Sequence, residues 1–307
     1  KGASYIKISA YNDNIEAMKV YSECLQKGYS KPDDEETNSN EESLKFYKKA
    51  ADKGDIVAIY NYGLMLCFGL GIPINLTVGI KYIKAAANVG LIGAIYNYAY
   101  FLQNGKGVPV NKVEALKYYK IAADKGDTYA MFNYAYMLDH GEGVPIDIDE
   151  AKKYYKKAME NDCVDAMLNY GIMLSKGNEE EQKEAAKYVK MAADRENINA
   201  IRDYAIMLKE GICIKVDKQL ACTYFERAAN KGDIKSMIIY AEMLEKGKEI
   251  KENREKALEY YKMAAMKGNI NALMRYCNLM SSDGNEERVK EAMEFFKKTI
   301  NGVKGKM

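Results

Sequence analysis

Four asparagines recur at a fixed spacing, and their side chains have the chemistry to hold a peptide backbone. They follow one another at intervals of 36 residues, at Asn61, Asn97, Asn133 and Asn169. One side-chain amide both donates and accepts hydrogen bonds, so it can satisfy an N–H and a C=O of an extended peptide whatever the peptide's own sequence. The column continues with Asp203 and ends at Ile239. We therefore interpret the four amides as a candidate peptide-binding ladder.

Aromatic and aliphatic side chains flank this ladder. The candidate site includes, beside the asparagines, Tyr60, Tyr96, Phe132 and Leu168, one residue before each of them, and Tyr100 and Tyr136, three residues after two of them. A tyrosine ring can be buried while its hydroxyl stays in contact with water, which suits a binding groove. The alternative is structural: the aromatic rings pack between neighbouring helices, and the asparagines bond across to the next helix.

Residues for other chemistry are few. The one histidine, His140, cannot anchor a multi-histidine metal site, and no two of the six cysteines form a Cys-x-x-Cys pair. The Gly-x-Gly pairs at 69–71, 105–107 and 141–143 recur once per repeat after a helical pattern, which indicates turns rather than a phosphate loop. The sequence therefore predicts no enzyme, no cofactor and no metal site.

Charge and hydropathy limit the classes of partner that the protein can be expected to bind. Lys and Arg number 46 against 44 Asp and Glu, so no large basic field favours nucleic acid. No apolar run is long enough to cross a bilayer, so no membrane partner is expected. Unpaired cysteines favour reduced thiols in a cytoplasmic protein, while a glycosylation triplet at Asn75 leaves the endoplasmic reticulum lumen as an alternative.

The elements that position these residues come from an internal repeat. Residues 91–126 and 127–162 match position by position, and fixed periods of this length are typical of stacked units with one continuous core. We predict one solenoid domain, 1–302, followed by a tail, 303–307. It would comprise a leading half repeat, 1–13, and eight repeats: 14–54, 55–90, 91–126, 127–162, 163–196, 197–232, 233–268 and 269–302.

Each repeat carries the pattern of two helices. One marker tyrosine lies in every first helix, at Tyr21, Tyr62, Tyr98, Tyr134, Tyr170, Tyr204, Tyr240 and Tyr276. Four residues before it stands a small residue, and four residues after it Leu or Met, so the three share one buried helix face. A small residue directly after the tyrosine lets the paired helix approach. The pattern predicts an all-α, right-handed superhelix (an α-solenoid) of antiparallel helix pairs.

The pattern resembles Sel1-like repeats, which are relatives of the tetratricopeptide repeat. In the third repeat the matching residues are Ala94, Ala99, Gly105, Gly107, Val108, Ala115, Tyr118, Ala122 and Ala123. One departure is systematic: Tyr98 stands where the family usually has leucine, and Leu102 where it usually has tyrosine. The resemblance implies that first helices line the concave surface and that the protein is an adaptor or scaffold.

We therefore predict a protein–protein interaction scaffold that binds an extended peptide segment of a partner on the concave face of repeats two to five. The alternative is a non-catalytic regulatory or spacer arm of a larger multidomain protein such as a kinase, which the half repeat at 1–13 motivates. Hydrolysis by the array ranks last, because the paired cysteines of some bacterial relatives are missing. Self-association through uncapped end repeats is a further expectation.

Overall fold

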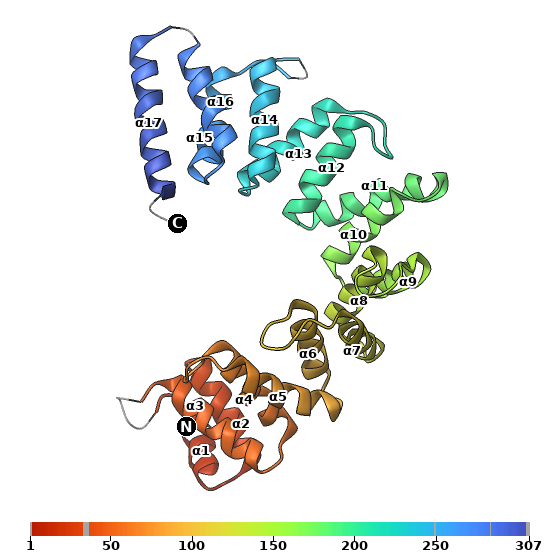
Figure 1. Cartoon of the computed structure of the whole chain (residues 1–307), viewed down its shortest axis with the longest axis vertical. Coiled ribbons are helices and arrows are strands. Elements are labelled where there is room, and N and C mark those ends of the chain that lie inside the picture. Colours follow the sequence, from red (N-terminus) through yellow and green to blue (C-terminus); the bar gives the residue numbers. More distant parts are fainter. Residues whose placement is uncertain (1, 33–36, 249, 283, 305–307) are drawn as a thin grey trace. The chain divides into compact units, whose positions relative to one another are not determined.

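The computed structural model describes residues 2–32, 37–248, 250–282 and 284–304. These residues form seventeen α-helices and no strand, which confirms the predicted all-α fold of paired helices (Figure 1). The chain divides into two compact units, residues 1–163 and 164–307, called unit 1 and unit 2 below. Each unit is described by itself.

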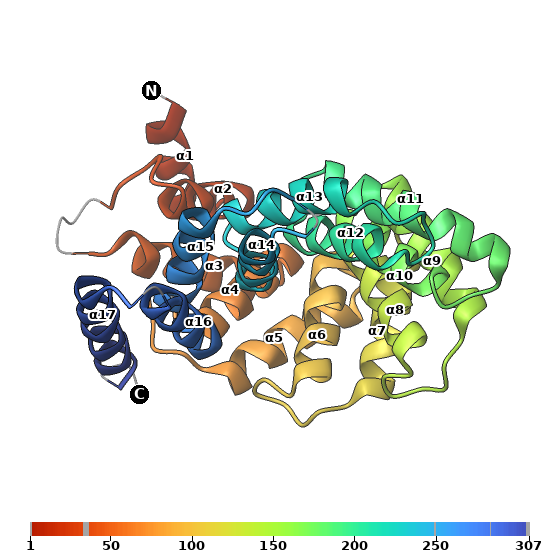
Figure 2. The same cartoon turned by 90° about the horizontal axis from the view of Figure 1, so that it is seen from above.

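The described residues of unit 1 form nine helices, and each packs against the next one along the chain (Figures 1 and 2). They are α1 (Gly2–Tyr11), α2 (Ile15–Gln26), α3 (Ser39–Asp52), α4 (Ile56–Phe68), α5 (Leu76–Asn88), α6 (Ile92–Asn104), α7 (Lys112–Asp124), α8 (Thr128–His140) and α9 (Ile148–Glu160). The first helices of its repeats are α2, α4, α6 and α8.

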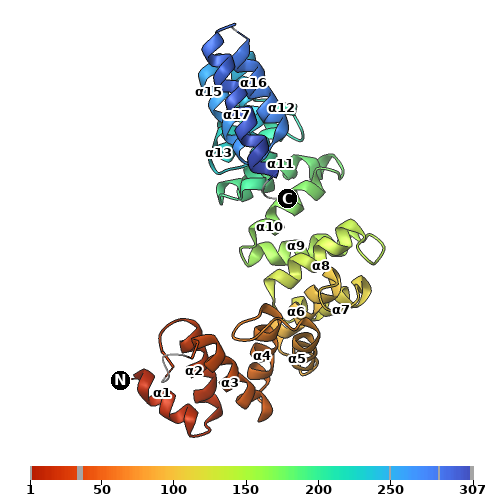
Figure 3. The same cartoon turned by 60° about the vertical axis from the view of Figure 1, so that its left-hand side comes forward.

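In the described part of unit 2 there are eight helices with the same alternation, and the last of them lie side by side in Figure 3. They are α10 (Val164–Leu174), α11 (Glu179–Asp194), α12 (Ile198–Glu210), α13 (Lys218–Asn230), α14 (Ile234–Lys246), α15 (Arg254–Met266), α16 (Ile270–Ser281) and α17 (Glu286–Lys304). The first helices are α10, α12, α14 and α16.

Side-chain caps fix where several of the first helices begin. The carboxylate of Asp127 accepts a hydrogen bond from the backbone N–H of Ala130 at 2.7 Å, and the amide oxygen of Asn197 accepts one from Ala200 at 3.0 Å. Each cap satisfies one of the backbone donors that a helix start leaves without a partner, which stabilises the helix by about 1 kcal/mol. The same device is therefore used in both units, whereas α6 begins after Leu91 without a side-chain cap.

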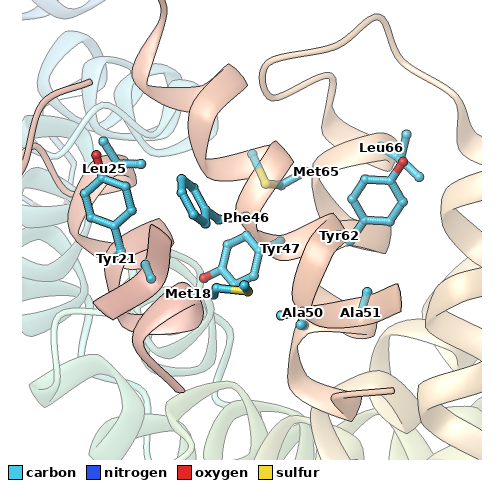
Figure 4. Close-up of a cluster of buried hydrophobic side chains, with 12 residues drawn as sticks. Met18, Tyr21, Leu25, Phe46, Tyr47, Ala50, Ala51, Tyr62, Met65 and Leu66 are labelled. Carbon is cyan, nitrogen blue, oxygen red and sulfur yellow. The ribbon is translucent and has the colours of Figure 1, made fainter. Parts of the chain in front are cut away.

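The marker tyrosines form the core of every repeat. Each packs edge to face on an aromatic ring of the second helix, with ring centroids 4.7 to 5.2 Å apart. The pairs are Tyr21–Phe46, Tyr62–Tyr82, Tyr98–Tyr118, Tyr134–Tyr154, Tyr170–Tyr188, Tyr204–Tyr224, Tyr240–Tyr260 and Tyr276–Phe295. Figure 4 shows this core in the first repeat, where Tyr21, Phe46 and Tyr47 face the same interior.

Small residues beside the marker tyrosine let the two helices touch. A Cβ added at Gly63 would lie 2.8 Å from the carbonyl oxygen of Gly79, and one at Gly171 would lie 2.7 Å from a methyl of Val189. Both distances are shorter than van der Waals contact allows. The helix pairs of both units therefore need a small side chain at this position, as the sequence pattern predicts.

A row of hydrogen bonds ties successive second helices together. The hydroxyl of Tyr118 donates to Oδ1 of Asn88 at 3.3 Å, and that of Tyr260 donates to Oδ1 of Asn230 at 2.7 Å. The Tyr154 hydroxyl donates to Asp124 in the same way. All three bonds connect residues 30 apart, so each links a second helix to the second helix before it.

Candidate functional site

Two asparagines of the ladder connect neighbouring first helices of unit 1. The amide nitrogen of Asn97, in α6, donates to the hydroxyl of Tyr60, in α4, at 2.6 Å and to the backbone carbonyl of Gly93 at 3.1 Å. The amide nitrogen of Asn133, in α8, donates to the hydroxyl of Tyr96, in α6, at 3.4 Å. The predicted ladder is thus also a set of Asn–Tyr bonds along α4, α6 and α8.

The other two asparagines have different partners. Asn61, in α4, lies near Tyr47, in α3, and opposes the rise in pKa that burial causes in that tyrosine. The amide nitrogen of Asn169, in α10 of unit 2, donates to the backbone carbonyl of Asp165 in its own helix at 2.9 Å. The residue one repeat before Asn169 in the tyrosine column is Phe132, which has no hydroxyl to accept a bond. All four asparagines are half-buried.

The two bonded tyrosines remain neutral at physiological pH. Burial raises the pKa of Tyr60 and of Tyr96, and the hydrogen bonds from Asn97 and Asn133 oppose that rise. A phenol with a raised pKa keeps its proton, so each hydroxyl can accept from an asparagine and still donate. Since neither partner is charged, the Asn–Tyr bonds do not change with pH in the neutral range.

The remaining predicted residues differ in exposure. The ring of Tyr100 is 36% exposed, and Lys106 Nζ donates to its hydroxyl at 3.2 Å. Half-buried Tyr136 stacks on the His140 ring, with centroids 4.0 Å apart and planes 19° apart. Phe132 lies 6.1 Å from Tyr136, centroid to centroid, whereas Leu168 in unit 2 is buried. Tyr100 is therefore the exposed aromatic ring of the set, whereas Tyr60, Tyr96, Phe132 and Tyr136 are half-buried.

Two residues that the sequence analysis did not single out belong to the same surface. A Cβ added at Gly93 would lie 3.3 Å from the Tyr60 hydroxyl, so Gly93 leaves the room in which that hydroxyl sits. Tyr129 occupies the corresponding position one repeat later, is 67% exposed, and lies 6.2 Å from the Tyr96 ring. Their position, one helical turn before an asparagine of the ladder, is the signal that could have found them.

Other reactive groups are isolated in the structure. Nδ1 of His140 lies 3.0 Å from the Tyr136 backbone carbonyl and 3.5 Å from an Asp139 carboxylate oxygen. Burial raises the pKa of the Cys67 thiol to about 11. Among the described residues, no three His, Cys, Asp or Glu side chains gather in a way that could hold a metal ion. No helix in the part of the chain that the structure describes is long and apolar enough to cross a membrane.

The fold and the row of first helices define a helical-repeat protein of the tetratricopeptide-like class. The Sel1 repeat family model matches seven consecutive stretches: 15–55, 56–91, 92–127, 128–163, 164–197, 198–233 and 234–269. The chain therefore belongs to the Sel1 repeat family. Repeats of this family are in general non-catalytic protein–protein interaction modules, so the coarse prediction of an interaction scaffold holds.

Solved structures of similar fold agree with this assignment. The protein c5321 of uropathogenic Escherichia coli, described as a protective antigen with an SLR fold, superposes with a TM-score of 0.78 at 24% identity, over 98% of this chain and 64% of that one. A Sel1 repeat protein from Oxalobacter formigenes gives a TM-score of 0.75 at 20% identity, over 99% and 89%. Yeast Tom70 gives 0.52 at 14% identity, over 95% and 61%. The chain thus spans less than two thirds of c5321. A search of curated protein sequences gives no significant match.

Proposed function

We propose that the chain is a scaffold that binds an extended peptide segment of a partner protein along the face made by α4, α6 and α8 of unit 1. The observation that carries the proposal is the fixed orientation of the amides. The hydrogen bonds described for Asn97 and Asn133 all use the amide nitrogen, so each Oδ1 can accept a hydrogen bond from a peptide N–H.

Tyrosine positions these amides before a partner arrives. A side chain already held in its binding rotamer loses less entropy on binding, which favours affinity. The exposed rings of Tyr100 and Tyr129 and the half-buried ring of Tyr136 lie beside the amides and supply apolar surface for the peptide's side chains. The amides would therefore bind the peptide backbone whatever its sequence, and the rings would select among peptide side chains.

A peptide-display selection on the whole chain tests this proposal. We expect extended peptides to enrich on the parent and to be lost on the Asn97→Ala/Asn133→Ala variant. Tyr60→Phe should weaken the same peptides by a smaller factor, because it removes the hydroxyl that orients Asn97 and leaves the exposed surface unchanged. Asn199→Ala, at an exposed position in α12 of unit 2, is the matched control and should bind like the parent.

Circular dichroism and thermal unfolding separate lost binding from lost folding. Peptides that bind parent and double variant equally would show that the amides are purely structural. The function of the chain as a spacer or regulatory arm would then be the better explanation.

We also propose that the chain self-associates through α1, the N-terminal helix of unit 1. Tyr5 is 73% exposed and Ile8 is 56% exposed, and both lie on α1. In sequence register Tyr5 corresponds to the second-helix aromatic that packs on a marker tyrosine in every repeat. We expect Tyr5→Ser/Ile8→Ser to abolish a dimer seen in sedimentation equilibrium, and an unchanged dimer would place the contact elsewhere.

A further inference from the structure

A cavity of about 460 Å³ lies in unit 2, between the second helix α11 and the repeat that follows it. Its wall comprises Lys183, Ala186, Lys187, Lys190, Met191 and Asp194 of α11, with Tyr204 of α12 and Cys213 and Ile214 of the turn after α12. The volume is in the range of ligand-binding pockets in general. The surface is distinct from the α4, α6 and α8 face, and the inference below does not depend on the function proposed there.

Two local departures from the repeat pattern meet at this cavity. The turn before α11 is shortened, and α11 has 16 residues where α7 and α13 have 13 each. In the turn after α12, Cys213 takes the place of a glycine and has a φ of 59°, in the left-handed region. The corresponding Gly143 of unit 1 leaves no such space, because a Cβ there would lie 2.4 Å from the Cβ of Lys112. The altered turns thus replace a close contact by an open space.

Three lysines give this space its charge. Lys183, Lys187 and Lys190 follow one another at spacings of four and three residues, which places them on one face of α11. Lys190 pairs with Asp194 at 2.7 Å, and Lys187 lies 3.5 Å from Glu184. The lysines outnumber the one acidic residue of the wall, Asp194, and the floor between them is apolar, with Met191 and Ile214.

The same position two repeats later provides an internal comparison. A smaller cavity of about 230 Å³ lies beside α15, where Glu255, Glu259 and Lys262 stand 72 residues after Lys183, Lys187 and Lys190. Glu255 there pairs with Arg288 at 2.5 Å. A cavity lies at this site in both repeats and is larger where the turns are altered, and of the two only the α11 cavity has more basic than acidic residues in its wall. The charge therefore does not follow from the fold.

We propose that the α11 cavity binds an acidic peptide segment of a partner protein, in which one apolar side chain enters between Met191 and Ile214 and neighbouring carboxylates lie over Lys183 and Lys187. Opposite charges across such a contact set its specificity and speed association. Lysine stems can cover the apolar part of the peptide while their ammonium groups meet the carboxylates. The occupant is thus defined by one apolar residue flanked by acidic residues.

A blocked pentapeptide of four glutamates around one phenylalanine is a suitable probe, and calorimetry on the whole chain measures its binding. We expect Lys183→Gln/Lys187→Gln to weaken binding about tenfold at low salt, because each exposed charge pair contributes modestly. Added salt should weaken the parent's binding towards that of the variant, since exposed charges are screened. The control is Lys81→Gln/Lys117→Gln, which removes exposed lysines at the same repeat position of α5 and α7, and it should bind like the parent.

Protection of Cys213 localises the peptide. In mildly alkaline buffer, which offsets the pKa rise that burial causes in this thiol, bound peptide should slow alkylation of Cys213 by iodoacetamide. Half-buried Cys24 of unit 1 should react at its unchanged rate. Equal binding of a pentapeptide with glutamines in place of the glutamates, equal binding by the lysine variant, or unprotected Cys213 would each overturn the proposal.

Discussion

The first-helix surfaces of the two units differ in how neighbouring helices are joined. In unit 1, α4, α6 and α8 are connected by neutral Asn–Tyr hydrogen bonds. In unit 2, the Arg202 guanidinium of α12 contacts Asp203 at 3.1 Å and Asp233, the residue that caps α14, at 3.0 Å. In the next repeats of unit 2, Ile238 stands at the position of the bonded tyrosines and Arg275 at the position of the bonded asparagines. A groove of about 430 Å³ lies there between α14 and α16. One fold thus supports a neutral surface joined by hydrogen bonds and a charged surface that contains a groove.

The comparison teaches that the core and the surface of these repeats vary independently. Every marker tyrosine keeps its edge-to-face partner in both units, although the residues one position away change from Asn to Asp, Ile and Arg. A rotation of about 100° separates adjacent residues on a helix, so a neighbour of a core residue can face a different environment. Surface chemistry can therefore differ between repeats without altering the fold.

The largest effect is expected from the shared core. Tyr134→Ala in unit 1 and Tyr204→Ala in unit 2 each remove a buried ring and its aromatic partner's contact, and each should lower the free energy of unfolding by about 3 to 5 kcal/mol. Denaturant unfolding measures both losses, with the phenylalanine variants as controls that keep the ring. A loss in one unit of less than half that in the other would break the claim of a common core.

Substitutions at the turn position of Gly143 and Cys213 should change stability in opposite directions in the two units. Gly143→Cys in unit 1 should destabilise by about 2 kcal/mol or more, because the new Cβ meets Lys112 and the backbone there has a φ of 81°. The reverse change in unit 2, Cys213→Gly, should stabilise by about 1 kcal/mol by relieving left-handed strain. Thermal unfolding of the two variants provides the measurement, and shifts of the same sign would refute the contrast.

Loss of one Asn–Tyr bond should have a smaller effect. Tyr60→Phe removes the acceptor for Asn97 and should cost about 1 kcal/mol of unfolding free energy, in line with an ordinary hydrogen bond. Tyr129→Phe alters an exposed hydroxyl nearby and serves as the control, with no expected change. Chemical denaturation compares them. Identical stability of both variants would mean that the bond to Tyr60 contributes nothing to the fold.

The smallest effect concerns the acidic residue that continues the ladder in unit 2. Burial raises the pKa of Asp203 above its ordinary value of 3.8, with Arg202 opposing the rise. A carboxyl whose folded pKa is raised binds its proton more tightly in the native state, so its contribution to stability is largest below pH 3.8 and declines as pH rises through the folded pKa. The free energy of unfolding of Asp203→Asn relative to the parent should therefore rise from acid conditions to pH 7, by less than about 1 kcal/mol. If the stability of the variant relative to the parent falls as pH rises, the inferred direction of the Asp203 pKa shift is wrong.

The sequence predicted the helix pairs because burial follows the periodicity. The column of Ala94, Tyr98 and Leu102 recurs through the chain, and the structure buries these residues together. A bond from an asparagine across to the next helix was the structural alternative of the sequence analysis, but the pairing of Asn97 with Tyr60 did not follow from it. Both columns were visible, but their contact depends on the rotation between neighbouring first helices, which the pattern within one repeat does not contain.

The α11 cavity could not be predicted from the sequence for a similar reason. The shortened fifth repeat and the cysteine at position 213 were both readable in the sequence. That the shortening lengthens α11 and leaves space beside that cysteine depends on how the helix start adjusts, which is a tertiary effect.

The two rows of hydrogen bonds in unit 1 have a mechanical consequence. One row joins first helices through Tyr60–Asn97 and Tyr96–Asn133, and the other joins second helices through Tyr118–Asn88 and Tyr154–Asp124. Bending the stack of repeats towards either side lengthens the bonds of the opposite row. The stack from α4 to α9 therefore resists flexing in both directions, and hydrogen exchange should show these helices opening together.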